Sequence, residues 1–82
     1  MDISVEISMY PLGREYVPEI KAFIERIKKH QGIDLLVSGM STQIFGEYQH
    51  VMTILKDEMA HSFERDGKCV FVMKVVDGNL KK

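Results

Sequence analysis

The sequence lacks most of the features that reinforce the thin core of a small protein. It contains one cysteine, Cys69, in 82 residues, which excludes an internal disulfide and most cysteine-based zinc sites. Folds of this size usually gain stability from disulfides, metals or association. Association with another chain is therefore the stabilisation that we expect here.

The sequence also has no large excess of positive or negative charge and no long apolar run. Eleven Lys and Arg residues stand against twelve Asp and Glu, for a formal net charge of −1. Nucleic acid is therefore not expected as a partner, because proteins that bind it carry a concentrated basic surface. The start, MDISVEISMY, does not have a signal-peptide pattern, and no apolar run approaches membrane-spanning length. We therefore expect a cytoplasmic protein with no membrane partner.

The sequence offers no recognisable metal, phosphate or catalytic motif. His50 and His61 lie in one predicted helix, about 16 Å apart along its axis, and cannot share a metal within one chain. His30 is at the end of another helix, and we interpret all three histidines as solvated. There is no glycine-rich phosphate loop, and nothing supplies Cys69 with a base. We predict no metal, no cofactor and no enzymatic activity.

Hydrophobic spacing predicts four strands and two helices. Residues 3–9 alternate apolar and polar side chains, as in a strand with one buried face. Helical spacing starts near Pro18, which suits a first turn, and continues to about Gln31, where Gly32 ends it. Further strands are predicted at 33–37, 42–45 and 69–76, and a second helix from Gly46 to Asp66 with an apolar stripe of Tyr48, Val51, Met52, Leu55, Met59 and Phe63.

The order of these elements is strand–helix–strand, twice. The connection at 38–41 is so short that the strands it joins must be antiparallel. Right-handed crossovers then favour the α+β, ferredoxin-like βαββαβ sandwich. We expect one domain over residues 1–82, with a four-stranded antiparallel sheet, two helices on one face and the opposite face open.

The last strand, CVFVMKVV at 69–76, carries one charged residue, Lys74, in eight. Helices on one face of the sheet would leave its second set of apolar side chains uncovered. In the usual strand order it is also an edge, where an apolar strand tends to pair with another chain. We expect a second subunit to cover it by edge pairing, face packing or both. The alternative is an ordinary strand whose ends, Cys69, Val70 and Val76, lie under loops.

Hydroxyls, a carboxylate and aromatic rings gather in two segments near strand ends, ISMYPLG (7–13) and GMSTQIFGEY (39–48). Such side chains can surround a small, flat, polar ligand, with polar groups that orient it and a ring that stacks on it. The candidates are Ser8, Tyr10, Ser41, Thr42, Gln43, Phe45 and Glu47. The alternative is that Glu47 only complements a helix dipole and that Ser41 and Thr42 are ordinary turn residues.

The segments SMYPLG, GMSTQIFGE, EYQHVM and CVFVMKVVDG resemble the HMP/thiamine-binding (YkoF-like) family over essentially the whole chain. The resemblance implies a ferredoxin-like unit that associates in pairs or tetramers and that, in some members, binds thiamine or its hydroxymethylpyrimidine half. This chain has one unit, so a second copy would complete such a pocket.

A thiamine-like ligand suits the candidate residues. An aminopyrimidine needs paired donors and acceptors, and a cationic thiazolium favours a carboxylate and an aromatic face. If the ligand is of this kind, Glu6 or Glu47 would supply the carboxylate, and Ser8 and Thr42 would supply the hydroxyls. Phe45 or Tyr10 would be the ring that stacks on it. We therefore expect a non-catalytic homodimeric or homotetrameric binding protein for thiamine or hydroxymethylpyrimidine. The alternative is a protein-interaction module with no small-molecule ligand.

Overall fold

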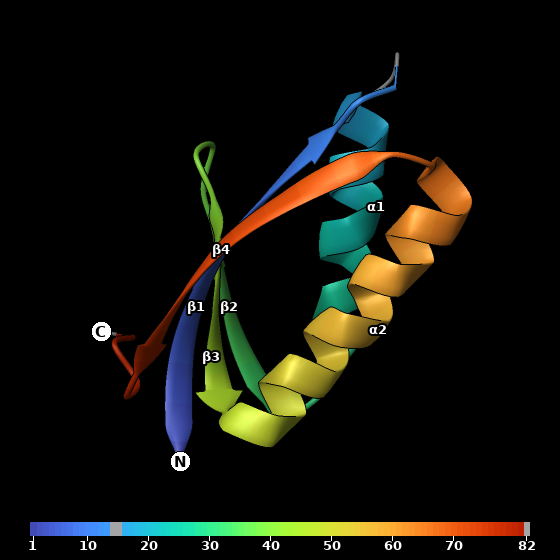
Figure 1. Cartoon of the computed structure of the whole chain (residues 1–82). Helices are drawn as coiled ribbons and strands as arrows, with labels where there is room; N and C mark the ends of the chain where they lie inside the picture. Colours follow the sequence, from blue (N-terminus) through green and yellow to red (C-terminus); the bar gives the residue numbers. More distant parts are fainter. Residues whose placement is uncertain (14–15, 82) are drawn as a thin grey trace.

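The computed structural model describes residues 1–13 and 16–81 and contains the six elements that the sequence predicts. They are β1 (Asp2–Pro11), α1 (Tyr16–Lys28), β2 (Ile33–Val37), β3 (Thr42–Glu47), α2 (Tyr48–Asp66) and β4 (Cys69–Asp77). The strands form one antiparallel sheet in the order β2-β3-β1-β4, and both helices lie on the same face of it (Figure 1). The ferredoxin-like α+β fold is confirmed. No helix in the described ranges is long and apolar enough to cross a membrane.

The core lies between β1 and the two helices. β1 is a central strand, and its alternate residues Ile3, Val5 and Ile7 are each 2% exposed. Their period of two places them all on the helix side of the sheet. The other buried members of this core are Met9, Phe23, Ile27, Ile44, Val51, Ile54 and Leu55.

The first helix ends at Lys28, earlier than the predicted Gln31. The backbone N–H groups of Lys29 and His30 donate to carbonyls three residues back, at 3.3 and 3.1 Å. Such bonds tighten the final turn of a helix. Gly32 then adopts a φ of 81°, a conformation that favours glycine, as the chain turns into β2.

The second helix begins at Tyr48 instead of the predicted Gly46, because Gly46 is still paired with Ile3 in the sheet. Its buried side consists of Val51, Ile54, Leu55 and Ser62. The predicted apolar stripe is therefore wrong at both ends, where Tyr48 is 40% and Phe63 is 50% exposed. The predicted end is confirmed, with Gly67 as the C-cap at a φ of 79°.

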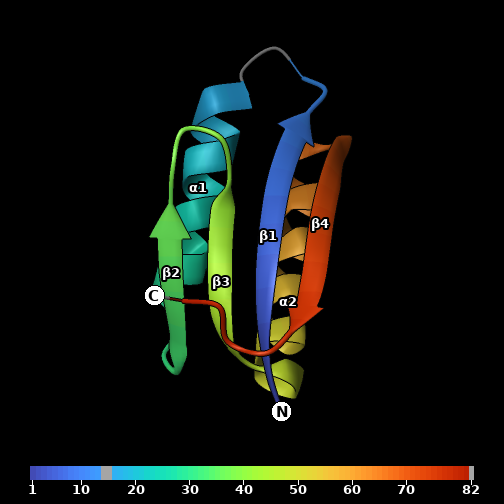
Figure 2. The ribbon, with the colours of Figure 1, turned by 90° about the vertical axis from the view of Figure 1, so that its left-hand side faces the viewer.

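The sheet face away from the helices is only partly open, which corrects the expectation of an open face. Ser4 and Phe45 are cross-strand neighbours on this face, yet they are 8% and 3% exposed. After β4 the chain turns at Gly78 and crosses the face toward β2 (Figure 2). There the Nζ atom of Lys81 lies 3.5 Å from Oδ1 of Asp34.

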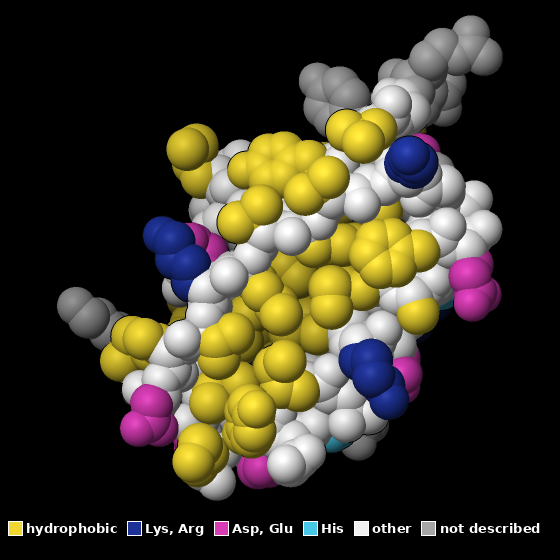
Figure 3. Space-filling view, viewed as in Figure 1, with side chains coloured by type: hydrophobic (Ala, Val, Ile, Leu, Met, Phe, Trp, Pro, Cys, Tyr) yellow, Lys and Arg dark blue, Asp and Glu magenta, His cyan; other side chains and the backbone are white. Residues whose placement is uncertain are grey.

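The edge strand β4 is apolar on both faces, as the sequence predicts. On the helix side, hydrophobic side chains form a continuous surface between β4 and α2 (Figure 3). Val75 of β4 and Phe63 of α2 are exposed. On the opposite face, Val70, Val72 and Val76 are 45%, 53% and 44% exposed. The helices therefore leave β4 incompletely covered.

The close approach of β3, β2 and α2 at Gly46 gives a test of the packing. A Cβ atom there would lie 3.0 Å from Cγ2 of Val51 and 3.2 Å from Cγ2 of Ile33. We expect Gly46→Ala to lower the free energy of unfolding by about 1–3 kcal/mol through overpacking, as measured by urea denaturation. Gly39→Ala is the control, because its Cβ would meet nothing within 4 Å. Equal losses in the two variants would contradict the packing.

Candidate functional site

A cavity of about 330 Å³ opens between α1, the end of β1 and the β2–β3 connection. Its apolar lining comes from Ile7, Met9, Ile20, Phe23 and Ile24, and its hydroxyls from Ser8, Tyr10, Ser38, Ser41 and Thr42. We call it the hydroxyl-lined cavity. It brings together four of the residues that the sequence nominates, Ser8, Tyr10, Ser41 and Thr42.

The β2–β3 connection, which forms one side of this cavity, is shaped by Ser38. Its Oγ atom accepts hydrogen bonds from the backbone N–H groups of Met40 and Ser41, each at 3.2 Å. This side-chain turn holds Ser41 in place and leaves Met40, at the tip beside the cavity, 89% exposed. The serine in this tight connection therefore sets the position of a cavity hydroxyl.

Glu6 acts on the cavity through Ser41. Glu6 is not part of the cavity lining, but its Oε2 atom accepts a hydrogen bond from the Ser41 hydroxyl, with 3.1 Å between the two oxygens. Its Oε1 atom lies 3.4 Å from Nζ of Lys74. Because the one hydrogen of Ser41 points to Glu6, the oxygen presents lone pairs to other groups. The carboxylate thus makes Ser41 an acceptor for a donor in the cavity.

The cavity offers hydrogen bonds and apolar surface without charge. None of the described residues that line it is Asp, Glu, Lys, Arg or His. Its rings are Tyr10, which is 54% exposed, and Phe23, which is 2% exposed. This lining suits a flat, uncharged ring with polar groups at its edge. The sequence did not nominate Phe23, because its helical spacing is also that of an ordinary core residue.

Phe45, the other ring that the sequence nominates, does not reach the hydroxyl-lined cavity, and neither does Gln43. Phe45 lies on the opposite face of the sheet and lines a separate hollow of about 290 Å³. The other lining residues of this hollow are Ser4, Val5, Glu6, Gln43, Lys74, Val76 and Leu80. The structure therefore divides the nominated residues between two faces.

Glu47 has a structural position at the N-cap of α2. Its carboxylate accepts from the backbone N–H groups of Gln49 and His50, both at 3.0 Å, and these bonds lower the pKa of Glu47. Thr42 and Glu47 are at opposite ends of β3, so about 17 Å of strand separates Glu47 from the cavity. The structure thus places Glu47 as a cap, which is the alternative that the sequence left open.

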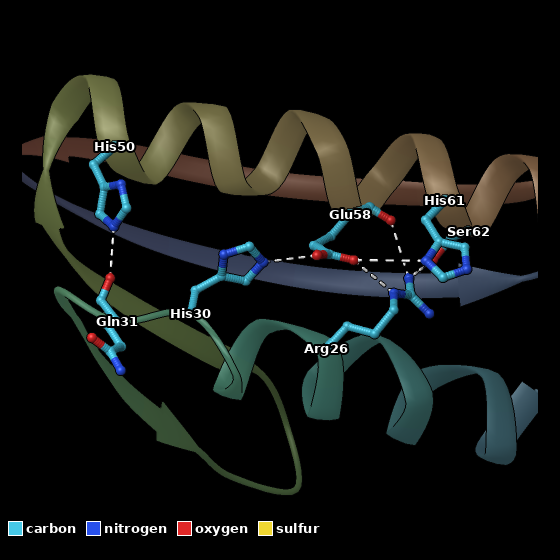
Figure 4. Close-up of polar contacts among 7 residues, drawn as sticks. All are labelled: Arg26, His30, Gln31, His50, Glu58, His61 and Ser62. Carbon is cyan, nitrogen blue, oxygen red and sulfur yellow. Dashed lines mark hydrogen bonds and ion pairs between the residues drawn. The ribbon is translucent and has the colours of Figure 1, made fainter.

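A second polar cluster joins the two helices (Figure 4). Nε of Arg26 lies 2.7 Å from Oε1 of Glu58, and Nε2 of His30 lies 2.8 Å from Oε2. Arg26 also donates to Oγ of Ser62 at 2.7 Å. Burial raises the pKa of Glu58, but the hydrogen bonds from His30 and Arg26 outweigh it and hold the pKa below its ordinary value. We call this cluster the helix clasp.

The histidines are engaged more closely than the sequence predicts. His30 belongs to the helix clasp, and Nε2 of His50 is 2.7 Å from the carbonyl oxygen of Gln31 (Figure 4). His50 is exposed, as the sequence predicts, whereas His30 is half-buried. Across residues 1–13 and 16–81, no group of three or more His, Cys, Asp or Glu side chains is arranged to hold a metal.

The pKa of Glu58 predicts how the helix clasp depends on pH. A carboxyl whose pKa is lower in the folded state stabilises the fold above its unfolded value, and that contribution is lost as the pH falls. We expect Glu58→Gln to cost about 2 kcal/mol at pH 7 and much less at pH 3, as measured by urea denaturation. Glu25→Gln is the control, since Glu25 is 64% exposed in its pair with Lys28. A Glu58→Gln cost that is the same at both pH values would contradict the assignment.

The chain is similar to a known protein family and to several solved structures. A family model described as thiamine-binding protein matches residues 5–79. Among solved structures, a Streptococcus pneumoniae protein has a TM-score of 0.87 at 20% identity, and the match covers 98% of this chain and 90% of that one. No curated protein matches the chain significantly.

Two further solved structures are similar. A Thermotoga maritima protein, whose proposed role is thiamine biosynthesis or salvage, has a TM-score of 0.81 at 19% identity, over 99% of this chain and 85% of that one. A domain of unknown function from Bacillus cereus has a TM-score of 0.77 at 15% identity, over 96% and 78%. At these identities the likeness shows the fold alone.

Proposed function

The chain belongs to the thiamine-binding protein family, and from that membership we propose that it is a non-catalytic, homo-oligomeric binding protein for thiamine or its hydroxymethylpyrimidine half. The observation that carries the proposal is the hydroxyl-lined cavity, where Ser8, Tyr10, Ser41 and Thr42 meet over apolar side chains. A flat ring between apolar walls, with hydroxyls at its edge, is what a pyrimidine requires.

The chemistry of the cavity matches the pyrimidine better than the thiazolium. Ser41, with its hydrogen committed to Glu6, is an acceptor suited to the exocyclic amine. The described lining contains no carboxylate to balance a cation, so the thiazolium of thiamine would lie toward the solvent. The same described lining holds no carboxylate, histidine or lysine to act as a general base, which supports binding without catalysis.

Self-association is supported by the surface around β4. This strand is at the sheet edge, and both of its faces present exposed apolar side chains, Val75 on the helix side and Val70, Val72 and Val76 on the other. Lys74 is the one basic side chain that β4 carries. An exposed apolar edge strand offers backbone groups and side chains to another chain. A second copy, in a homodimer or homotetramer, would cover this surface.

The same surface favours the second candidate, a protein-interaction module without a small-molecule ligand. In that case β4 and its flanking faces would be the functional site, and the hydroxyl-lined cavity would have no ligand. The two candidates differ in one observable property. The interaction module would associate without any response to pyrimidines, whereas the binding protein would respond to them.

Calorimetric titration of hydroxymethylpyrimidine and of thiamine into the purified protein tests the binding function. We expect heat with both compounds, and a Kd raised about three- to tenfold in Ser41→Ala and in Thr42→Ala, from the loss of one hydrogen bond each. Gln43→Ala is the matched control, because Gln43 is next to Thr42 in β3 but lines the other hollow. The absence of heat with either compound at millimolar protein would reject the binding function and leave the interaction module.

Sedimentation velocity over a concentration series tests self-association. We expect the wild-type protein to form dimers or tetramers and Val72→Glu to dissociate them, because the change places a charge on the apolar face of β4. Thr53→Glu, on the exposed side of α2, is the control and should not alter association. Wild-type protein that remains monomeric at every concentration would contradict the proposal.

A further inference from the structure

The segment Gly78–Lys81, which we call the strap, is fixed across the sheet by Ser4. The Oγ atom of Ser4 donates to the carbonyl oxygen of Gly78 and accepts from the backbone N–H of Leu80, both at 2.8 Å. The backbone N–H of Gly78 donates to the carbonyl oxygen of Asp2 at 2.9 Å. One buried hydroxyl on β1 therefore fixes the strap at two points, as a donor to Gly78 and as an acceptor from Leu80.

The strap crosses the sheet face on which the ring of Phe45 lies (Figure 2). This ring lies on the sheet face that no helix covers, yet it is 3% exposed. Leu80, which lines the hollow together with Phe45, is itself 62% exposed. At the far end, the pair between Lys81 and Asp34 attaches the strap to β2. The strap therefore spans the face from the end of β4 to the opposite edge strand (Figure 2).

The position of the strap limits what else can pack on this face. Two sheets that pack face to face lie about 10 Å apart, and side chains fill the space between them. A main chain that crosses the face occupies this space. The strap and a second sheet therefore compete for the part of the face over β1, β3 and β2. The outer part, with Val70 and Val72 on β4, is left open to a second copy.

We propose that the strap is an intramolecular competitor for a second copy of this chain. When the strap is bound to the sheet, it confines self-association to the β4 side. When it is released, Phe45 is exposed and a second interface opens. The inference rests on the self-association proposed above.

The chemistry of the face supports a second copy as the occupant. Glu6 and Lys74 are cross-strand neighbours on it, with Val72 and Val76 on either side of Lys74. Lys74 has a side chain that is 82% exposed, so it can reach a group outside its own chain. A copy related by a two-fold axis would present its own Glu6 to this lysine, and its own apolar residues to Phe45. The face is therefore complementary to itself in charge and in apolar surface.

The experiment compares three variants with the wild-type protein by sedimentation velocity over a concentration series. Truncation after Asp77 removes the strap, and Ser4→Ala removes the two hydrogen bonds that the Ser4 hydroxyl makes with it while keeping the bond from Gly78 to Asp2. Truncation after Leu80 is the matched control, because it keeps the Ser4 bonds and loses the contacts of Lys81 with Asp34 and Asn79. We expect the first two variants to associate about tenfold more tightly than the wild type and to form a larger species, because they expose Phe45. The control should change little.

Hydrogen exchange of the Leu80 amide reports the strap independently of association. We expect this amide to be protected in the wild type and unprotected in Ser4→Ala. If the Leu80 amide is protected in the wild type and all four proteins associate equally, the competition is overturned while self-association stays intact. Monomers throughout would reject self-association and the competition together. Because Ser4→Ala keeps the whole chain, it tests the competition even if the truncated protein does not fold.

Discussion

The structure depends on one constraint, which is that a four-stranded sheet has two faces and this chain has two helices for only one of them. The alternation of Ile3, Val5 and Ile7 along β1 commits the central strand to the helix side. What remains is a second face and the edge strand β4, whose apolar side chains the helices do not cover. The strap shields one part of that remainder, and another chain would be needed for the rest.

The polar side chains are divided between holding the fold and lining a site. Glu47 caps α2 and Glu58 joins the two helices, so these carboxylates use their lone pairs within the fold. Glu6 contributes indirectly, since it orients the hydroxyl of Ser41 at the cavity. The result is a cavity lined by hydroxyls and apolar groups, with the carboxylates outside it. Such a lining favours an uncharged ring over a cation, which is why the pyrimidine half is the better match.

Much of the fold could be predicted because it follows from local periodicity. A period of two in residues 3–9 and helical spacing after Pro18 gave elements whose order admits few right-handed arrangements. The family resemblance, drawn from four short segments, is confirmed by the family match over residues 5–79. Element ends were less accurate, because Gly46 stays in β3 through its pairing with Ile3, a contact distant in sequence. The same limit explains why the predicted apolar stripe of α2 is wrong at its two ends, and why the role of His30 was missed.

The sequence by itself determined the elements, their order, the apolar character of β4 and four polar residues that share one cavity. Ser8 and Tyr10 lie near the end of β1, and Ser41 and Thr42 lie where β3 begins, so antiparallel pairing of those strands had to bring them near each other. Only the tertiary structure decided which face each side chain occupies and what covers it. The segment that crosses the face of Phe45 starts 33 residues later in the chain, and no local pattern encodes that path. Spacing fixes which residues share a face of one element, whereas the partner of that face depends on the path of the whole chain.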